Sequence, residues 1–237
     1  MTRKTKILII TIAAFVAVAI AAGVFVLCFY LPEKKEKAEI ERMVREYYQN
    51  KLSVYREENE RYADGEVDVA FLGDSLTDGY DLEAYYPQYT VSNRGIGGET
   101  TFGLEERLSI SLYDLKPRVA VILIGGNNLD TMLENYERMI VDITSKLPET
   151  KIVICSLTSM GRDWAHKNQI AAYNNAMLGK LSEKHGIEMV DLFTPLLDLE
   201  SGEIYAEYTT DGAHLTPRGY EVLTAAITPA IEKALAG

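Results

Sequence analysis

The sequence predicts an α/β protein, in which a five-stranded parallel sheet with helices on both faces follows a membrane-spanning helix and a charged helical stalk. Three features indicate this arrangement. From residue 67 onward, short apolar runs alternate with amphipathic helical patterns, which is typical of a three-layer, doubly wound sheet. Residues 7–31 contain no charged side chain, whereas residues 32–63 are rich in charge. Four polar segments that contain glycine or asparagine lie in predicted loops.

The composition is that of a folded protein, and it excludes several classes of binding partner. The chain has 237 residues, of which 47% are hydrophobic and 25% charged, enough for one sizeable core. Its formal net charge is -11, so phosphate backbones repel it and no nucleic-acid partner is expected. Cys28 and Cys155 fall in segments that should not meet, and no metal or nucleotide motif occurs. We therefore expect no disulfide, no metal and no cofactor.

The N-terminal part predicts a single-pass membrane anchor. Residues 1–6 form a basic tail, and residues 7–31 would make a helix of roughly 37 Å, long enough to cross a bilayer core. The apolar run is longer than the core of a cleaved signal peptide, so we expect it to be retained. We expect the C-terminal domain outside the cytoplasm because basic residues precede the span, as in an export signal. The Lys and Arg residues after the span favour the opposite orientation.

Residues 32–63 predict a charged helical stalk. Ile40, Met43, Val44 and Tyr47 recur at helical spacing and give the stalk one apolar stripe. The stripe is expected to pack on the domain that follows, residues 64–237, and dimerisation through it is the alternative. The sequence does not predict the oligomeric state.

The domain that follows alternates strands with helices. This alternation predicts a parallel sheet, whose third strand, Arg118–Ile124, is apolar enough to be buried on both faces. Ligands of such sheets bind beyond the carboxyl ends of the strands. The last helix is expected to kink or restart at Pro229. The predicted strands are Val67–Leu72, Tyr89–Asn93, Arg118–Ile124, Lys151–Leu157 and Ile187–Leu192, and the predicted helices cover 99–113, 130–147, 166–185 and 217–235.

Four loop segments carry polar groups toward one edge of this sheet. Each has a structural explanation when taken alone, such as a turn or a helix cap. Together they supply the groups that a nucleophilic serine requires, and they therefore predict an active site. The segments are Gly73–Asp78, Asn93–Thr100, Gly125–Asn128 and Asp211–His214.

The residue types in these segments match the roles of a serine-based reaction. Ser75 is the candidate nucleophile, His214 its base, and Asp211, three residues earlier, the group that orients the imidazole. The backbone N–H groups of Ser75 and Gly98 and the side-chain amide of Asn127 are the candidate donors of an oxyanion hole.

With these motifs in order, residues 67–237 resemble an SGNH hydrolase of the GDSL esterase/lipase family. The four motif residues of that family match Ser75 in GDSL, Gly98 in the glycine loop, Asn127 in GGNN and His214 in D-x-x-H. The stretches NRGIGGETT and VILIGGNN resemble the branch that includes catalytic subunits of platelet-activating-factor acetylhydrolase. The resemblance implies a flavodoxin-like fold and an acyl-ester substrate. Asn128 departs from the family pattern, which has an acid there.

The predicted function is a membrane-anchored serine esterase that forms an acyl-enzyme on Ser75. Its substrates are expected among O-acetylated glycans, short-chain esters and lysophospholipids. The alternative from another class is a glycan-binding protein on a degenerate hydrolase fold, which Asn128 supports. Trp164 is expected either to line the substrate cleft or to cover the edge of the core. Tyr80, Tyr85 and Tyr86 are expected either to wall the pocket or, with better support, to pack in the core.

Overall fold

The computed structural model describes residues 2–3, 5–6, 25, 28 and 30–236. The chain divides into two compact units, residues 1–50 and 51–237. Helix α2, Leu31–Asn59, begins in the first unit and ends in the second, where Leu52 and Tyr55 are buried. Most of the predicted membrane span, residues 7–31, lies outside the described residues. Within the described part of the chain, no helix combines the length and the apolar character that crossing a membrane requires.

The second unit is built on a five-stranded sheet, as the sequence predicts. The strand order is β2-β1-β3-β4-β5, and every neighbouring pair is parallel. Because β1 pairs with β2 on one side and with β3 on the other, the connections change direction at β1, which is the switch point where such sheets bind ligands. The strands are β1 Val69–Gly73, β2 Val91–Gly95, β3 Val119–Leu123, β4 Lys151–Cys155 and β5 Glu188–Val190.

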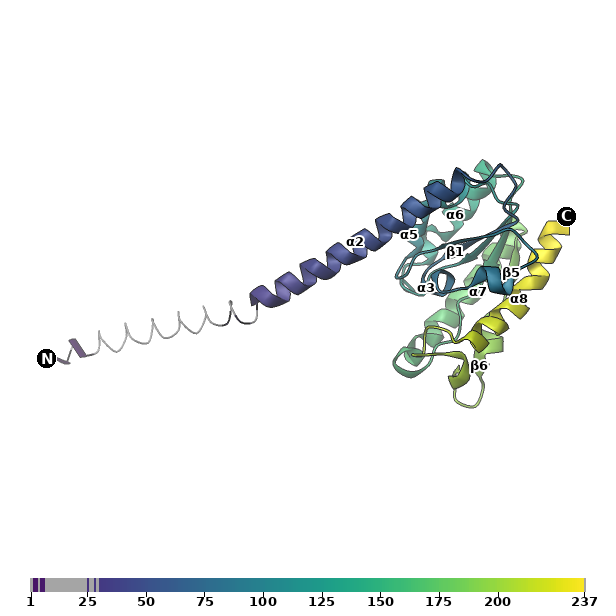
Figure 1. Ribbon diagram of the computed structural model, residues 1–237. Coiled ribbons are helices and arrows are strands. Elements are labelled where there is room, and N and C mark those ends of the chain that lie inside the picture. The colour runs from purple at the N-terminus through teal and green to yellow at the C-terminus, as the bar shows by residue number, and fades with distance from the viewer. Residues whose placement is uncertain (1, 4, 7–24, 26–27, 29, 237) are drawn as a thin grey trace. The chain divides into compact units, whose positions relative to one another are not determined.

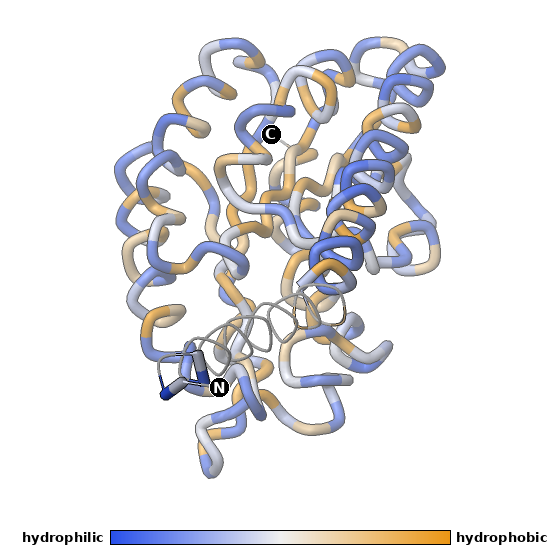
Figure 2. Tube along the Cα trace, turned by 90° about the vertical axis from the view of Figure 1, so that its left-hand side faces the viewer, coloured by the Kyte–Doolittle hydropathy of each residue, from blue (hydrophilic) through white to orange (hydrophobic). Residues whose placement is uncertain are grey.

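Helices cover both faces of the sheet and enclose two apolar clusters (Figure 1). Alternate residues of β1 and β3 point into different clusters, which explains why these strands are apolar throughout. Figure 2 shows apolar residues gathered along the central strands and polar residues on the outer turns. The helices are α3 Ser75–Asp78, α4 Leu82–Tyr85, α5 Thr101–Glu106, α6 Leu133–Lys146, α7 Asn168–His185 and α8 Pro217–Ala236.

Several elements differ in detail from the prediction. The helical pattern at 99–113 divides into α5 and a π-helical turn at Ser109–Tyr113. The sequence predicts a kink or a restart of the last helix at Pro229, and the restart does not occur, because α8 continues through this residue. Ile227, Ala230 and Ile231 are buried on both sides of the proline, so packing against the sheet holds the helix together. The remaining elements are 3₁₀ turns at Arg162–Lys167, Thr194–Leu196 and Ala206–Tyr208, and a two-stranded hairpin of β6 Leu197–Asp198 and β7 Glu203–Ile204.

Close packing at the ends of β1 and β2 brings the first two polar segments together. Gly73 pairs in register with Gly95 of β2 and with Leu123 of β3. A Cβ atom at Gly95 would collide with the backbone of Asp78, so glycine is required where α3 crosses the end of β2. The loops after β1, β2 and β3 therefore meet at one edge of the sheet.

Candidate active site

Ser75 stands directly beyond the carboxyl end of β1. It is the first residue of α3, and Asp74 before it caps this short helix by accepting a hydrogen bond from the N–H of Leu76 at 3.1 Å. The Ser75 side chain is partly exposed, whereas Asp74 is buried. The turn thus presents the serine hydroxyl at the sheet edge while Asp74 before it packs into the protein.

His214 connects Ser75 with Asp211. Its Nε2 lies 3.0 Å from Oγ of Ser75, and its Nδ1 lies 2.7 Å from Oδ2 of Asp211. Because a carboxylate only accepts hydrogen bonds, Nδ1 carries the proton and Nε2 of the neutral ring can accept one from the serine. The structure therefore brings these three predicted residues together in the predicted order.

The loop that holds Asp211 and His214 has a fixed backbone. Oδ1 of Asp211 accepts hydrogen bonds from the N–H groups of Ala213 and His214, at 2.9 and 2.8 Å. Gly212 has a φ of +97°, and a Cβ there would collide with the carbonyl of Gly161. The hydrogen bonds from His214 hold the pKa of the Asp211 carboxyl well below its usual range, so this carboxylate stays charged.

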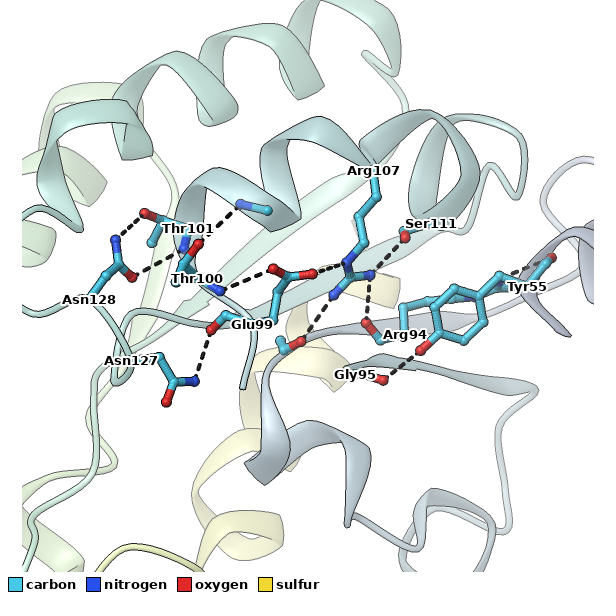
Figure 3. A network of polar contacts seen from close by, with 12 residues as sticks. Tyr55, Arg94, Gly95, Glu99, Thr100, Thr101, Arg107, Ser111, Asn127 and Asn128 are labelled. Atoms are coloured by element: carbon cyan, nitrogen blue, oxygen red, sulfur yellow. Dashed lines mark hydrogen bonds and ion pairs between the residues drawn. The ribbon is translucent and has the colours of Figure 1, made fainter. Parts of the chain in front are cut away.

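The predicted oxyanion donors lie on neighbouring loops. Asn127 follows β3, and its Nδ2 donates to the carbonyl oxygen of Glu99 at 2.9 Å (Figure 3). This contact orients the amide, because only the nitrogen can donate to a carbonyl. Gly98 has a φ of +77°, which favours glycine, and it lies in the glycine loop, residues 96–100. Ser75, Asn127 and His214 line one pocket, and Gly98 is not among the lining residues.

Asn128, the departure from the family pattern, joins two loops. Its Oδ1 accepts from the N–H of Thr101 at 3.2 Å, and its Nδ2 lies 2.9 Å from Oγ1 of the same residue (Figure 3). Nδ2 also lies 3.3 Å from Oγ1 of Thr131. An aspartate could accept from the same hydroxyl groups, since hydroxyls both donate and accept. Asn128 therefore ties the loop after β3 to the start of α5 through contacts with Thr101 that an aspartate could make in part.

The pocket beside Ser75 is small and mainly apolar. Its volume is about 100 Å³. Trp164, whose side chain is 40% exposed, lines this pocket, so it belongs to the cleft. Tyr80 and Tyr86 are instead buried in the core, with their hydroxyl groups 3.2 Å apart. The pocket is lined by Asp74, Ser75, Leu76, Leu123, Gly126, Asn127, Leu157, Thr158, Met160, Trp164, Ala213 and His214.

A larger groove adjoins this pocket and shares Gly126 and Asn127 with it. Its volume is about 420 Å³, and most of its other residues are polar. At its border, Nζ of Lys167 lies 4.5 Å from the ring centre of Trp164. The residues that line only the groove are Asn128, Leu129, Asp130, Thr131, His166, Lys167 and Ile170.

The sequence does not indicate the positions of three charged residues near the site. Asp74 reads as a helix cap, yet it also lines the pocket, and burial raises its pKa to about 6. Arg94 and Arg107 resemble ordinary charged residues in the sequence, but both are fully buried behind the glycine loop. Only the unusual charge inside the motif NRGIGG hints at the first of them. Within the described residues, no group of three His, Cys, Asp or Glu side chains is placed to hold a metal ion.

A doubly wound parallel sheet with serine, histidine and aspartate in hydrogen-bonded order at its carboxyl edge is typical of serine hydrolases. The family model for the GDSL-like lipase/acylhydrolase family matches residues 71–222. The chain belongs to this family, and it is a carboxylic ester hydrolase. Among curated proteins, no sequence matches the chain.

Solved structures agree with this assignment. A protein of Streptococcus pneumonia, described provisionally as a platelet activating factor, has 26% sequence identity and a TM-score of 0.73, covering 84% of this chain and 99% of its own. A GDSL-like lipase of Bacteroides thetaiotaomicron has 25% identity and a TM-score of 0.69, covering 77% and 98%. An acetyl xylan esterase of Geobacillus stearothermophilus shares the fold, with 20% identity, a TM-score of 0.58 and coverage of 71% and 95%.

The buried carboxyl of Asp74 predicts a dependence of stability on pH. Its pKa is about 6 in the folded protein and 3.8 in the reference state, so the folded chain binds the proton more tightly. The resulting stability is fully present below pH 3.8 and is lost as the pH rises through about 6. We expect Asp74→Asn, which keeps a capping oxygen, to make the free energy of unfolding less dependent on pH between pH 5 and pH 8. Urea unfolding of both proteins at pH 5 and at pH 8 measures this dependence. An equal change of the unfolding free energy with pH in the two proteins would contradict the raised pKa of Asp74.

Proposed function

We propose that this protein is a membrane-anchored serine esterase that removes a short acyl group from a polar alcohol. The observation that carries the chemistry is the contact of 3.0 Å between Oγ of Ser75 and Nε2 of His214, with Asp211 on the other ring nitrogen. Membership of the acylhydrolase family supports it and disfavours the glycan-binding alternative.

The proposed reaction has two steps. His214 takes the proton of Ser75 as Oγ attacks the ester carbonyl, and the resulting oxyanion accepts hydrogen bonds from the N–H groups of Ser75 and Gly98 and from the Asn127 amide. When the tetrahedral intermediate collapses, His214 gives the proton to the leaving alcohol. Water then attacks the acyl-enzyme with His214 as base, and the acid leaves as Ser75 regains its proton. Asp211 stays ionised and stabilises the imidazolium in both steps.

The volume of the pocket supports a short acyl group. At about 100 Å³, the pocket is smaller than the cavities of about 150 Å³ that accept benzene, so an acyl chain of many carbons would have to extend beyond it. The apolar side chains of Leu76, Leu157 and Met160 suit the methyl or methylene groups of the acid. Among the expected substrates, acetyl and other short-chain esters are therefore favoured over lysophospholipids.

The adjoining groove supports a polar alcohol. It begins at Asn127, beside the serine, and exposes charged and amide side chains, including Asp130, His166 and Lys167. These groups offer hydrogen bonds to hydroxyl groups, and the exposed ring of Trp164 at the border offers an apolar face. An O-acetylated sugar has both features, and we propose it as the substrate class.

The membrane anchor and the location of the domain belong to the same proposal. The uncharged segment 7–31 and the basic residues Arg3, Lys4 and Lys6 support a single span with the esterase domain outside the cytoplasm. This placement would bring the site near O-acetylated glycans of a cell surface.

Replacement of Ser75 tests the chemistry. We expect Ser75→Ala to abolish hydrolysis of p-nitrophenyl acetate by the full-length chain in detergent, because the acyl-enzyme requires the serine oxygen. Circular dichroism and thermal unfolding report whether the variant is folded. Unchanged turnover in a folded Ser75→Ala protein would contradict the proposed nucleophile.

A series of acyl chains tests the size of the pocket. We expect kcat/KM to fall at least tenfold between p-nitrophenyl butyrate and octanoate, because the longer chain exceeds the pocket. Met160→Ala shortens a side chain that lines the pocket, which enlarges the pocket, and it should raise the activity on octanoate relative to butyrate. Met139→Ala removes the same side chain from the core away from the pocket and should leave the chain-length preference unchanged. A preference for octanoate in the unmodified protein would contradict the proposed acyl group.

Protease treatment of intact cells tests the orientation. If the esterase domain is outside, added protease should release a fragment of roughly 170–200 residues by cleavage between the span and the domain. Cells permeabilised before treatment provide the control for total protein. Protection in intact cells, with cleavage only after permeabilisation, would place the domain in the cytoplasm.

A further inference from the structure

We propose that the last turns of α2, residues 51–59, position the oxyanion hole through two buried arginines, and that Tyr55, Arg94, Arg107 and Glu99 are positioning residues for catalysis. This inference rests on the oxyanion role proposed above for Gly98 and Asn127. The network is drawn in Figure 3, which shows Tyr55 and Arg94 at one end and Asn127 at the other.

Arg107 clamps the strand that leads to Ser75 and the loop that carries Gly98. The guanidinium is 2% exposed. Its Nη2 donates to the carbonyl of Gly73 at 3.1 Å, and its Nη1 donates to the carbonyl of Arg94 at 3.0 Å, so one side chain holds the ends of β1 and β2 (Figure 3). Nη1 also donates to Oγ of Ser111 at 2.8 Å. The distance between the nucleophile and the glycine loop therefore depends on this residue.

Glu99 connects Arg107 to Asn127. One carboxylate oxygen accepts from Nε of Arg107 at 3.0 Å, and the other accepts from the N–H of Thr100 at 3.1 Å. The backbone carbonyl of the same residue accepts from Nδ2 of Asn127 at 2.9 Å. One hydrogen of the Asn127 amide is thus used to fix its orientation, and the other remains to be directed at the oxyanion. A shift of Glu99 would turn that amide.

Arg94 and Tyr55 connect α2 to the base of the glycine loop. Nη1 of Arg94 donates to the carbonyl of Tyr55 at 3.1 Å, its Nη2 lies 3.0 Å from Oε2 of Glu58, and its Nε donates to Oγ of Ser92 at 2.7 Å. The hydroxyl of Tyr55 donates to the carbonyl of Gly95, the last residue of β2, at 2.5 Å. The guanidinium also lies over the ring of Tyr55, 4.8 Å from its centre.

Burial makes this network rigid. Arg94 and Arg107 are 0% and 2% exposed, and a buried cation is tolerated only where hydrogen bonds and an anion replace its water. Because the contacts reinforce one another in a medium of low dielectric, loss of one member loosens the others. A simple role in folding would need no link to Asn127. The continuous path from Tyr55 to the oxyanion donor is what points to catalysis.

Two full-length variants and a matched control test the proposal in detergent. Tyr55→Phe removes only the hydroxyl at Gly95, and Glu99→Gln removes the charge that faces Arg107. Tyr136→Phe is the control, because the Tyr136 hydroxyl is buried in α6 and has no hydrogen-bond partner among the described residues. We expect Tyr55→Phe to lower kcat about threefold to tenfold, the effect of one buried hydrogen bond, with KM unchanged within twofold. Glu99→Gln should lower kcat further, and Tyr136→Phe should leave it unchanged.

A double-mutant cycle with Asn127→Ala separates positioning from stability. Asn127→Ala alone should lower kcat about 10²–10³-fold, as expected for one oxyanion donor. If Glu99 acts through Asn127, Glu99→Gln should cost much less in the Asn127→Ala background than in the unmodified chain. Thermal unfolding shows that each variant is folded at the assay temperature.

The outcomes that contradict the proposal differ from those that contradict the function. Effects of Glu99→Gln and Asn127→Ala that multiply, or equal kcat values for Tyr55→Phe and Tyr136→Phe, would overturn the positioning role while Ser75→Ala still abolishes activity. Full activity of Asn127→Ala would overturn the oxyanion assignment itself, and the positioning proposal with it.

Discussion

The sheet is parallel, its central strands β1, β3 and β4 carry apolar residues on both faces, and this constraint decides where chemistry can occur. A strand buried on both faces has no room for a reactive polar side chain, which must therefore stand beyond the strand end. At the switch point, the carboxyl ends of β1 and β3 lie side by side, so Ser75 and Asn127 face the same pocket. The topology of the sheet by itself therefore places the candidate site at the carboxyl ends of the strands.

The polar groups of the site divide into two sets with different physical roles. The side chains of His214 and Asp211 are about half exposed, at 52% and 50%, and a polar contact in that setting contributes little to stability. Their own loop holds both side chains, and His214 is free to exchange protons with Ser75 and with bound groups. The arginines behind the glycine loop are buried and hydrogen-bonded on several sides, so they restrict the backbone that carries the proposed oxyanion donors. Proton transfer and the fixing of the loops therefore depend on separate residues.

The last turns of α2 pack against the sheet domain. Lys51 forms an ion pair with Asp78 of α3, and Asn59 donates to the carbonyl of Ile110 at 2.7 Å, in addition to the contacts of Tyr55 and Glu58. The sequence predicts a domain that starts at residue 64, with a stalk before it. The compact unit that holds the sheet begins at Lys51, and these four side chains find partners on elements much later in the chain.

The sequence alone predicted the succession of strands and helices along the chain and the burial of the central strand on both faces, because periodicity is a local property. It also pointed to Ser75, Asn127, Asp211 and His214 as candidate site residues, because loop motifs are local as well. It left open the place of Trp164 and the role of Asp74, and it gave no reason to bury Arg94 and Arg107. Those features depend on contacts between segments far apart in the chain, which local patterns do not record. Tertiary structure decided the size of the pocket and the support of the oxyanion loop, because a side chain's burial, partners and pKa exist only once distant elements have packed around it.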